Sequence, residues 1–136
     1  MSGRAQLREF EVVAVRPQVL KANVKGENVT VMIYLIPVVV ATEGDKVASV
    51  VSTPFVTVFS DSPRIGERCT PEKMATHESV VPDVKVTDEG GTELKVDERK
   101  LLLRVKVTNI NVYPDLRDDF GNPCVSVGWI QLMTVE

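Results

Sequence analysis

Apolar and polar residues alternate with a period of two along most of the chain, a pattern that predicts β-strands rather than helices. In the first half, strands are predicted over residues 10–14, 19–24 and 47–60. Leu101, Leu103, Val105 and Val107 mark the inward face of a later strand. Glycine-containing polar turns separate the early runs. Valine is abundant throughout, and its β-branched side chain suits a pleated sheet.

Residues 29–41 form a nearly continuous apolar run in which the alternation is lost. An antiparallel strand with one wet face carries polar residues on that face. This strand therefore needs cover on both faces, from a second sheet of the same chain or from another subunit. Pro37 has no amide hydrogen to donate, so it marks an edge, a bulge or a bend.

Residues 84–96 carry the clearest hairpin pattern of the chain. Alternating segments at 84–87 and 92–96 flank the turn sequence Asp88-Glu89-Gly90-Gly91, which predicts two paired antiparallel strands. Farther on, the inward parity changes between Val107 and Ile110, and again after Gly128. Each change predicts a bulge or a passage between packing layers.

Residues 61–81 interrupt the strand pattern, and residues 113–123 read as a polar loop. Thr70, Pro71 and Glu72 have the types expected at the N-cap, first position and first turn of a helix, which would reach about residue 78. The fold class is therefore all-β: an antiparallel β-sandwich or partly open β-barrel of about eight strands with at most one short helix. Residues 1–7 are expected to form a flexible N-terminal arm, and residues 8–136 a single domain.

The chain has 136 residues and a net charge of −3, and no apolar run is long enough for a membrane helix. An N-terminal signal peptide is not recognisable either. We therefore expect a soluble cytoplasmic protein without a membrane partner. Cys69 and Cys124 belong to no spaced motif, so both are predicted to be free thiols.

The segment from Cys69 to His77 is the first candidate for chemistry. It holds a thiol and the single histidine, with carboxylates at Glu67, Glu72 and Glu78. These types could serve a metal- or thiol-dependent enzyme. Residues eight apart on a helix are separated by about 12 Å along its axis, however, so a buried cysteine and a surface histidine are favoured.

The loop from Asp115 to Asn122 is the second candidate, because its carboxylates, Gly121 and Asn122 have the composition that Ca²⁺ prefers. It lacks the alternating acidic spacing of an EF-hand loop, and Arg117 is expected to pair with one of its carboxylates. A solvated turn is therefore favoured. We predict no metal and no cofactor.

Binding of single-stranded nucleic acid by a small β-barrel is a third possibility. The acidic net charge argues against it, and none of the aromatic residues lies within a cluster of Lys and Arg. The seven aromatic residues are Phe10, Tyr34, Phe55, Phe59, Tyr113, Phe120 and Trp129.

Association is the function that the pattern favours most. Residues 29–41, and the apolar stretches at 110–112 and 130–132, exceed what one sheet face needs. We therefore predict a non-enzymatic assembly or protein-binding module, a homo-oligomer or a binder of a protein partner. The predicted interface residues are Val31, Ile33, Tyr34 and Leu35. Nucleic-acid binding and the enzyme based on Cys69 and His77 are kept as alternatives.

Overall fold

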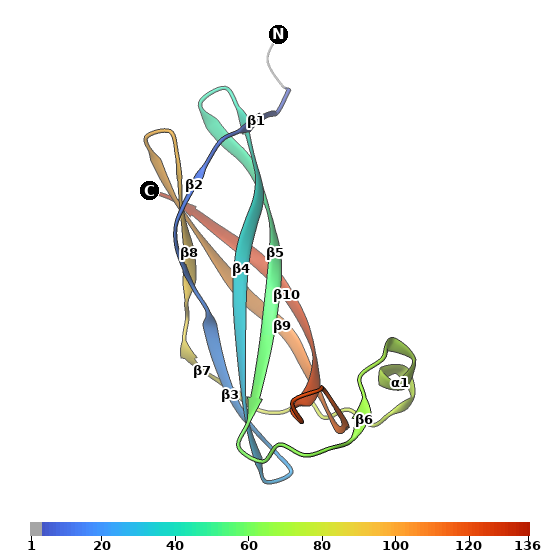
Figure 1. The fold of residues 1–136 in the computed structure, drawn as a ribbon. Coiled ribbons are helices and arrows are strands. Elements are labelled where there is room, and N and C mark those ends of the chain that lie inside the picture. Colours follow the sequence, from blue (N-terminus) through green and yellow to red (C-terminus); the bar gives the residue numbers. More distant parts are fainter. Residues whose placement is uncertain (1–3) are drawn as a thin grey trace.

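Two five-stranded sheets face each other in the computed structural model, which describes residues 4–136 (Figure 1). The first sheet contains β1 (Gln6–Arg8), β3 (Gln18–Val24), β4 (Glu27–Glu43), β5 (Lys46–Ser60) and β7 (Val84–Asp88). The second contains β2 (Glu11–Arg16), β6 (Glu67–Arg68), β8 (Gly91–Val96), β9 (Arg99–Arg117) and β10 (Pro123–Val135). All strand pairs are antiparallel except β6 with β9. The predicted all-β class is confirmed, and the architecture is a sandwich.

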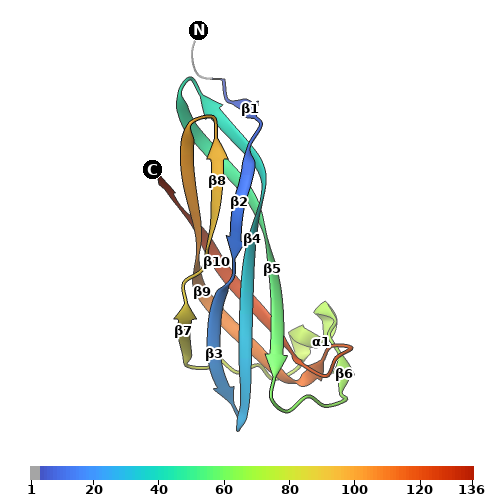
Figure 2. The same cartoon turned by 60° about the vertical axis from the view of Figure 1, so that its left-hand side comes forward.

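The long strands β4 and β9 lie at the centres of the two sheets. Strand β4 pairs with β3 and β5 on its two sides, and β1 joins its far end at Thr42. Strands β5 and β10 are consequently the edge strands on one side of the sandwich (Figure 2). Of the arm predicted over residues 1–7, the first three lie outside the described residues. Gln6 and Leu7 belong to β1.

The hairpin predicted over residues 84–96 is wrong. Strand β7 pairs with β3 in the first sheet, whereas β8 pairs with β2 and β9 in the second. The segment between them crosses from one layer to the other beside the crossing at Pro17. Gly90 has a φ of 63°, and an added Cβ would lie 2.4 Å from the carbonyl carbon of Pro17. Alternation suits a strand in either sheet, so the sequence pattern did not reveal the crossing.

The predicted irregularities of the long strands are confirmed. The register of β4 against β5 shifts between Pro37 and Val39, and that of β10 against β9 shifts between Gly128 and Trp129. At the second bulge the Asn109 side chain packs over Gly128, so a larger residue there would displace it. The bulge explains why both Val107 and Ile110 reach the core despite their odd spacing.

The segment after β5 carries the one helix of the described chain, α1 (Pro71–Thr76), as predicted. Thr70 is its N-cap and accepts a hydrogen bond from the Lys73 amide at 3.1 Å. Over residues 4–136, no helix has the length and apolar character needed to cross a membrane. The polar loop predicted over residues 113–123 is wrong in extent, since β9 continues to Arg117 and β10 begins at Pro123.

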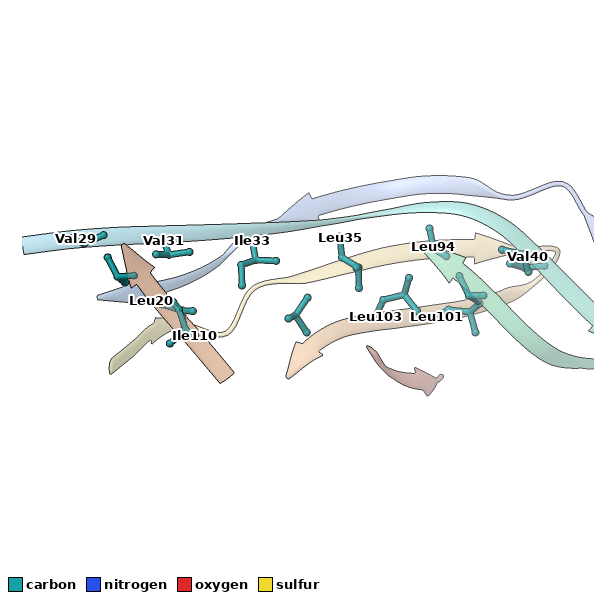
Figure 3. Packing of buried hydrophobic residues seen from close by; sticks show 14 of the residues in the cluster. Leu20, Val29, Val31, Ile33, Leu35, Val40, Leu94, Leu101, Leu103 and Ile110 are labelled. Atoms are coloured by element: carbon teal, nitrogen blue, oxygen red, sulfur yellow. The ribbon is translucent and has the colours of Figure 1, made fainter. Parts of the chain in front are cut away.

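The core lies between the sheets, where alternate side chains of β4 meet those of the second sheet. Figure 3 shows the inward side chains of β4 pointing toward β8 and β9. Two buried polar bonds join the layers: Gln18 Nε2 donates to the Val105 carbonyl at 2.9 Å, and Thr92 Oγ1 to the Leu35 carbonyl at 2.6 Å. The buried members from β4 include Val29, Val31, Ile33, Leu35 and Val40, which belong to one cluster with Leu94, Leu101 and Leu103.

Candidate functional site

The outer face of the first sheet carries exposed apolar side chains on β4 and β5. Phe55, Phe59 and Val51 of β5 are exposed by 56%, 55% and 55% of their surface. Phe55 lies directly opposite Tyr34 of β4, and Thr57 lies opposite Met32. Side chains of directly opposed residues share a face, so these groups form one patch. We call this set of β4 and β5 side chains the aromatic face: Met32, Tyr34, Ile36, Val51, Phe55 and Phe59.

Two lysines border the aromatic face on the side of β3 and β7. Phe59 is opposite Thr30, Thr30 is opposite Lys21, and Lys21 is opposite Lys85. The Lys21 ammonium donates to Thr30 Oγ1 at 3.0 Å, which fixes it on the outer side of the sheet. One transverse row therefore carries an aromatic ring at one end and two cations at the other.

The free edge of β5 is closed in two places by side chains of the second sheet and its loop. Gln131 Nε2 donates to the Val50 carbonyl at 3.0 Å, and the Ser60 amide donates to Asn122 Oδ1 at 3.0 Å. Main-chain groups alternate in direction along a strand, so the even-numbered residues from 50 to 60 all direct these groups away from β4. Pro54, at one of these positions, has no amide hydrogen.

The main-chain groups of Val56 and Val58 lie between these closures. Within residues 4–136, they have no hydrogen-bond partner beyond the edge of β5. Beside them is a cavity of about 680 Å³. The cavity lies where β5, α1 and the start of β10 meet, and its lining is mainly apolar. The residues around it include Val56, Phe59, Met74, Phe120, Val125 and the Cys69–Cys124 pair.

The two cysteines form a disulfide, so the predicted free thiols are wrong. Cys69 precedes α1 and Cys124 lies at the start of β10, with their Cα atoms 6.1 Å apart. The sequence offered no signal for this pairing, because the two residues are separated by 55 positions and share no motif. The bond fastens the segment with β6 and α1 to the end of the second sheet (Figure 1).

The disulfide also removes the thiolate on which the predicted enzyme alternative partly depended. His77 Nε2 lies 3.2 Å from Glu67 Oε2, and its Nδ1 lies 2.8 Å from the Lys73 carbonyl. Both ring nitrogens thus have local partners. Within the described part of the chain, no three His, Cys, Asp or Glu side chains are grouped as metal ligands would be.

The prediction that Arg117 pairs with a carboxylate of its own loop is wrong, because Arg117 pairs with Glu27 on β4. Its Nη1 and Nη2 lie 2.6 and 2.7 Å from the two carboxylate oxygens, and its Nε donates to the Pro114 carbonyl. The side chains of Arg117 and Glu27 are 1% and 12% exposed. Hydrogen bonding from Arg117, supported by the Ser60 hydroxyl and opposed by burial, lowers the pKa of Glu27. The pair joins the two sheets at one end of the sandwich.

The carboxylates of the loop at residues 115–122 hold the turn and its neighbours. Asp118 Oδ1 accepts hydrogen bonds from the amides of Phe120 and Asn122 at 2.9 and 3.0 Å. Asp119 lies 3.3 Å from an Arg68 nitrogen. This is the arrangement of a turn closed by an aspartate side chain.

The structure separates the four residues predicted to form an interface. Val31, Ile33 and Leu35 lie in the core, where the second sheet covers them, and a folded copy does not present them to another subunit. Tyr34 is half-buried on the opposite side, within the aromatic face. The exposed partners of Tyr34 on β5 were missed, because both faces of this strand carry apolar residues and the sequence does not indicate which face stays open.

Comparison with models of protein families, with curated proteins and with solved structures finds no match to this chain. The functional argument therefore depends on the geometry described above.

Proposed function

We propose that this protein is a non-enzymatic assembly or binding module that associates with copies of itself through the aromatic face. The observation that supports this is the joint exposure of Phe55, Phe59 and Val51 on one side of one sheet. Large contiguous apolar patches on a folded surface are typical of sites of association. Aromatic side chains are also enriched at the centres of protein interfaces.

The rigidity of this surface supports the same proposal. Strand β4 is paired on both sides and packed on its inner face, so Tyr34 and Met32 project from a fixed backbone. Contact groups that are already ordered lose little conformational entropy on binding. An ordered sheet face can meet an identical face across a two-fold axis, the commonest symmetry of homo-oligomers.

Light scattering at micromolar concentration tests the proposal. The wild-type protein is expected at a multiple of its 15.0 kDa chain mass. Phe55→Lys places a charge in the centre of the aromatic face and is expected to give monomers. Leu132→Lys is the matched control, because Leu132 is a similarly exposed apolar residue on β10 of the other sheet. A monomeric wild-type protein, or dissociation by Leu132→Lys alone, contradicts the proposal.

Binding of single-stranded nucleic acid is a second candidate, favoured by the row that joins Phe59 to Lys21 and Lys85. Stacking on an aromatic ring beside cations is how sheet surfaces hold single strands. The net charge of −3 argues against it. Titration with a labelled oligothymidine at several salt concentrations distinguishes the candidates, because binding to phosphates weakens steeply with salt. Lys21→Glu should abolish such binding and leave the chain mass unchanged.

The cytoplasmic location expected from the sequence stays a prediction, and the disulfide is an argument against it. Disulfides persist mainly in oxidising compartments and are uncommon in the cytosol of mesophiles. We therefore favour a compartment in which the bond between Cys69 and Cys124 stays oxidised. Thiol labelling of protein quenched in acid directly from cells tests this, since a cytosolic reduced protein would label at both cysteines.

A further inference from the structure

We propose that β5 at Val56–Val58, together with the cavity beside it, binds an extended apolar peptide segment of a partner protein. This inference goes beyond the association proposed above, because it concerns the free edge of the first sheet, and its cavity shares only Phe59 with the aromatic face. We call this site the edge window, defined by Val56, Thr57, Val58 and the cavity lining.

The main chain of β5 supplies the first argument. Its edge is closed at Val50 by Gln131 and at Ser60 by Asn122, and Pro54 removes a donor between them. Edge strands that are not blocked invite pairing with another chain, and proteins commonly block them with prolines or cover them. Among the described residues, none covers the β5 edge at Val56 and Val58. Between Pro54 and Ser60, the amides and carbonyls of Val56 and Val58 have no partner among the described residues, enough to pair with one short extended segment.

The cavity supplies the second argument, because it lies directly beside these open groups. A segment that pairs with β5 would direct every second side chain to the inner side of the sheet. The cavity of about 680 Å³ lies along this edge, is lined by the inward-facing Val56 and Val58, and presents Met74, Phe120 and Val125. Main-chain pairing with pockets for alternate side chains is the recognition mode of strand addition. A small apolar molecule would fill the cavity and leave the main-chain groups unpaired.

Charge selects among peptide segments. Of the described residues that line the cavity, Asp118 alone carries a charge. An acidic segment would be repelled, whereas an apolar segment flanked by Lys or Arg would be complementary to Asp118. A second copy of β5 fits poorly as the occupant. In each copy the contacts of Gln131 and Asn122 with β5 lie on both sides of Val56–Val58, so they would obstruct the approach of the two edges.

The test uses the full chain and a capped, labelled peptide, Lys-Thr-Phe-Thr-Val-Thr-Lys, in which Phe and Val share one face. Fluorescence anisotropy should give saturable binding below about 1 mM, the weak end of specific association. The same peptide N-methylated at Phe and Val, and separately at its three Thr residues, distinguishes the two pairing directions, because the amides that face β5 are those of Phe and Val in an antiparallel pair and those of Thr in a parallel pair. One of the two analogues should bind about tenfold more weakly, the loss expected for one or two hydrogen bonds.

Two variants and a control test the protein side. Val56→Pro removes the unpaired amide hydrogen of Val56, just as the native Pro54 has none. This variant should weaken binding about tenfold. Phe120→Ala removes an exposed wall of the cavity and should weaken binding several-fold. Ile65→Ala is the control, because Ile65 is fully exposed and lies outside this lining, and it should bind normally.

Amide hydrogen exchange locates the peptide. Protection at Val56 and Val58 on peptide addition supports the proposal, as does normal peptide binding by the Phe55→Lys variant. The proposal is overturned by absence of saturable binding, by equal binding of both N-methylated analogues and the parent peptide, or by protection confined to other strands. The amides of Val56 and Val58 could instead be protected already in an oligomer without peptide. That result would show that a second copy occupies the edge window, and it would also overturn the proposal. Failure of the oligomer test leaves these readouts unaffected.

Discussion

The two sides of β4 have similar sequences and opposite surroundings. On the inner side, Val29, Val31, Ile33 and Leu35 are buried against the second sheet. On the outer side, Thr30, Met32, Tyr34 and Ile36 are half-buried and lie beside the exposed rings of β5. The inner side holds the sandwich together, and the outer side forms the surface for which we propose association.

The comparison shows that apolar character alone does not say what covers a strand. By the argument from composition, the apolar residues on both sides of β4 need to be covered. The second sheet covers only the inner side. The two sides also differ in the polar residue with which each begins. Glu27 begins the inner row and is held by Arg117, whereas Asn28 begins the outer row and bonds to exposed Asp61.

The largest expected effect comes from placing a charge on the inner side. Ile33→Asp puts a carboxylate where the native side chain is 1% exposed, without a partner. Such burial costs more than about 4 kcal/mol, which is enough to unfold a domain of ordinary stability. We expect loss of the β-sheet circular dichroism spectrum. Lys85→Asp on the exposed face of β7 is the control and should fold; a folded Ile33→Asp protein would contradict the packing.

The strands and irregularities of this sandwich could be predicted because they depend on local pattern. Alternation identified β9, a continuous apolar run identified β4, and the parity change between Val107 and Ile110 identified a bulge. The layer to which each strand belongs depends on contacts distant in sequence. The residues at 84–96 look like a hairpin, and nothing local to Gly90 reveals that it packs against Pro17 in a crossing between layers.

The next effect concerns the polar end of the inner side. Glu27→Gln leaves the Arg117 guanidinium buried without its counter-charge, and breaking a buried pair in this way costs about 3–5 kcal/mol. Urea unfolding measures the loss. The double variant Glu27→Leu with Arg117→Met removes both charges and should recover most of the stability. Equal losses in the single and double variants would contradict the role of the pair.

Acid should weaken the wild-type protein through the same carboxylate. The pKa of Glu27 is lowered in the folded state, chiefly by the hydrogen bond from Arg117. Its contribution is therefore complete above the ordinary glutamate pKa of about 4.3 and is lost as the pH falls through the lowered value. The free energy of unfolding of Glu27→Gln should fall less steeply than that of the wild type over this range. Identical slopes would show that other carboxylates dominate.

The disulfide is expected to have a smaller effect, exerted mainly on the unfolded chain. It closes a loop across 55 positions, and removing such a bond typically costs about 2–4 kcal/mol. We expect Cys69→Ser with Cys124→Ser to lower the urea midpoint without changing the β-sheet spectrum. Thiol titration of the unreduced, denatured wild-type protein should find no free thiol; two thiols would contradict the bond.

The candidate site could be predicted only in part. Tyr34 was identified because its strand is apolar on both sides. The closing contacts of Gln131 and Asn122 on β5 join residues 81 and 62 positions apart, so they follow from the folded arrangement alone. The disulfide could not be predicted for the same reason, because Cys69 and Cys124 are distant in sequence.

The smallest effect on folding, and the sharpest test of the comparison, comes from Tyr34→Asp. Tyr34 is the immediate neighbour of Ile33 but points to the outer face, opposite Phe55. Aspartate disfavours a strand by about 1 kcal/mol or less at a partly exposed position, so the chain should stay folded with a slightly lowered urea midpoint. Its charge would face an identical surface across the proposed contact, and light scattering should therefore report monomers. Tyr34→Phe keeps the ring, and should keep the wild-type mass. If Tyr34→Asp unfolds the protein as Ile33→Asp does, both sides of β4 serve folding. If it folds and keeps the wild-type mass, the aromatic face is not where the copies meet.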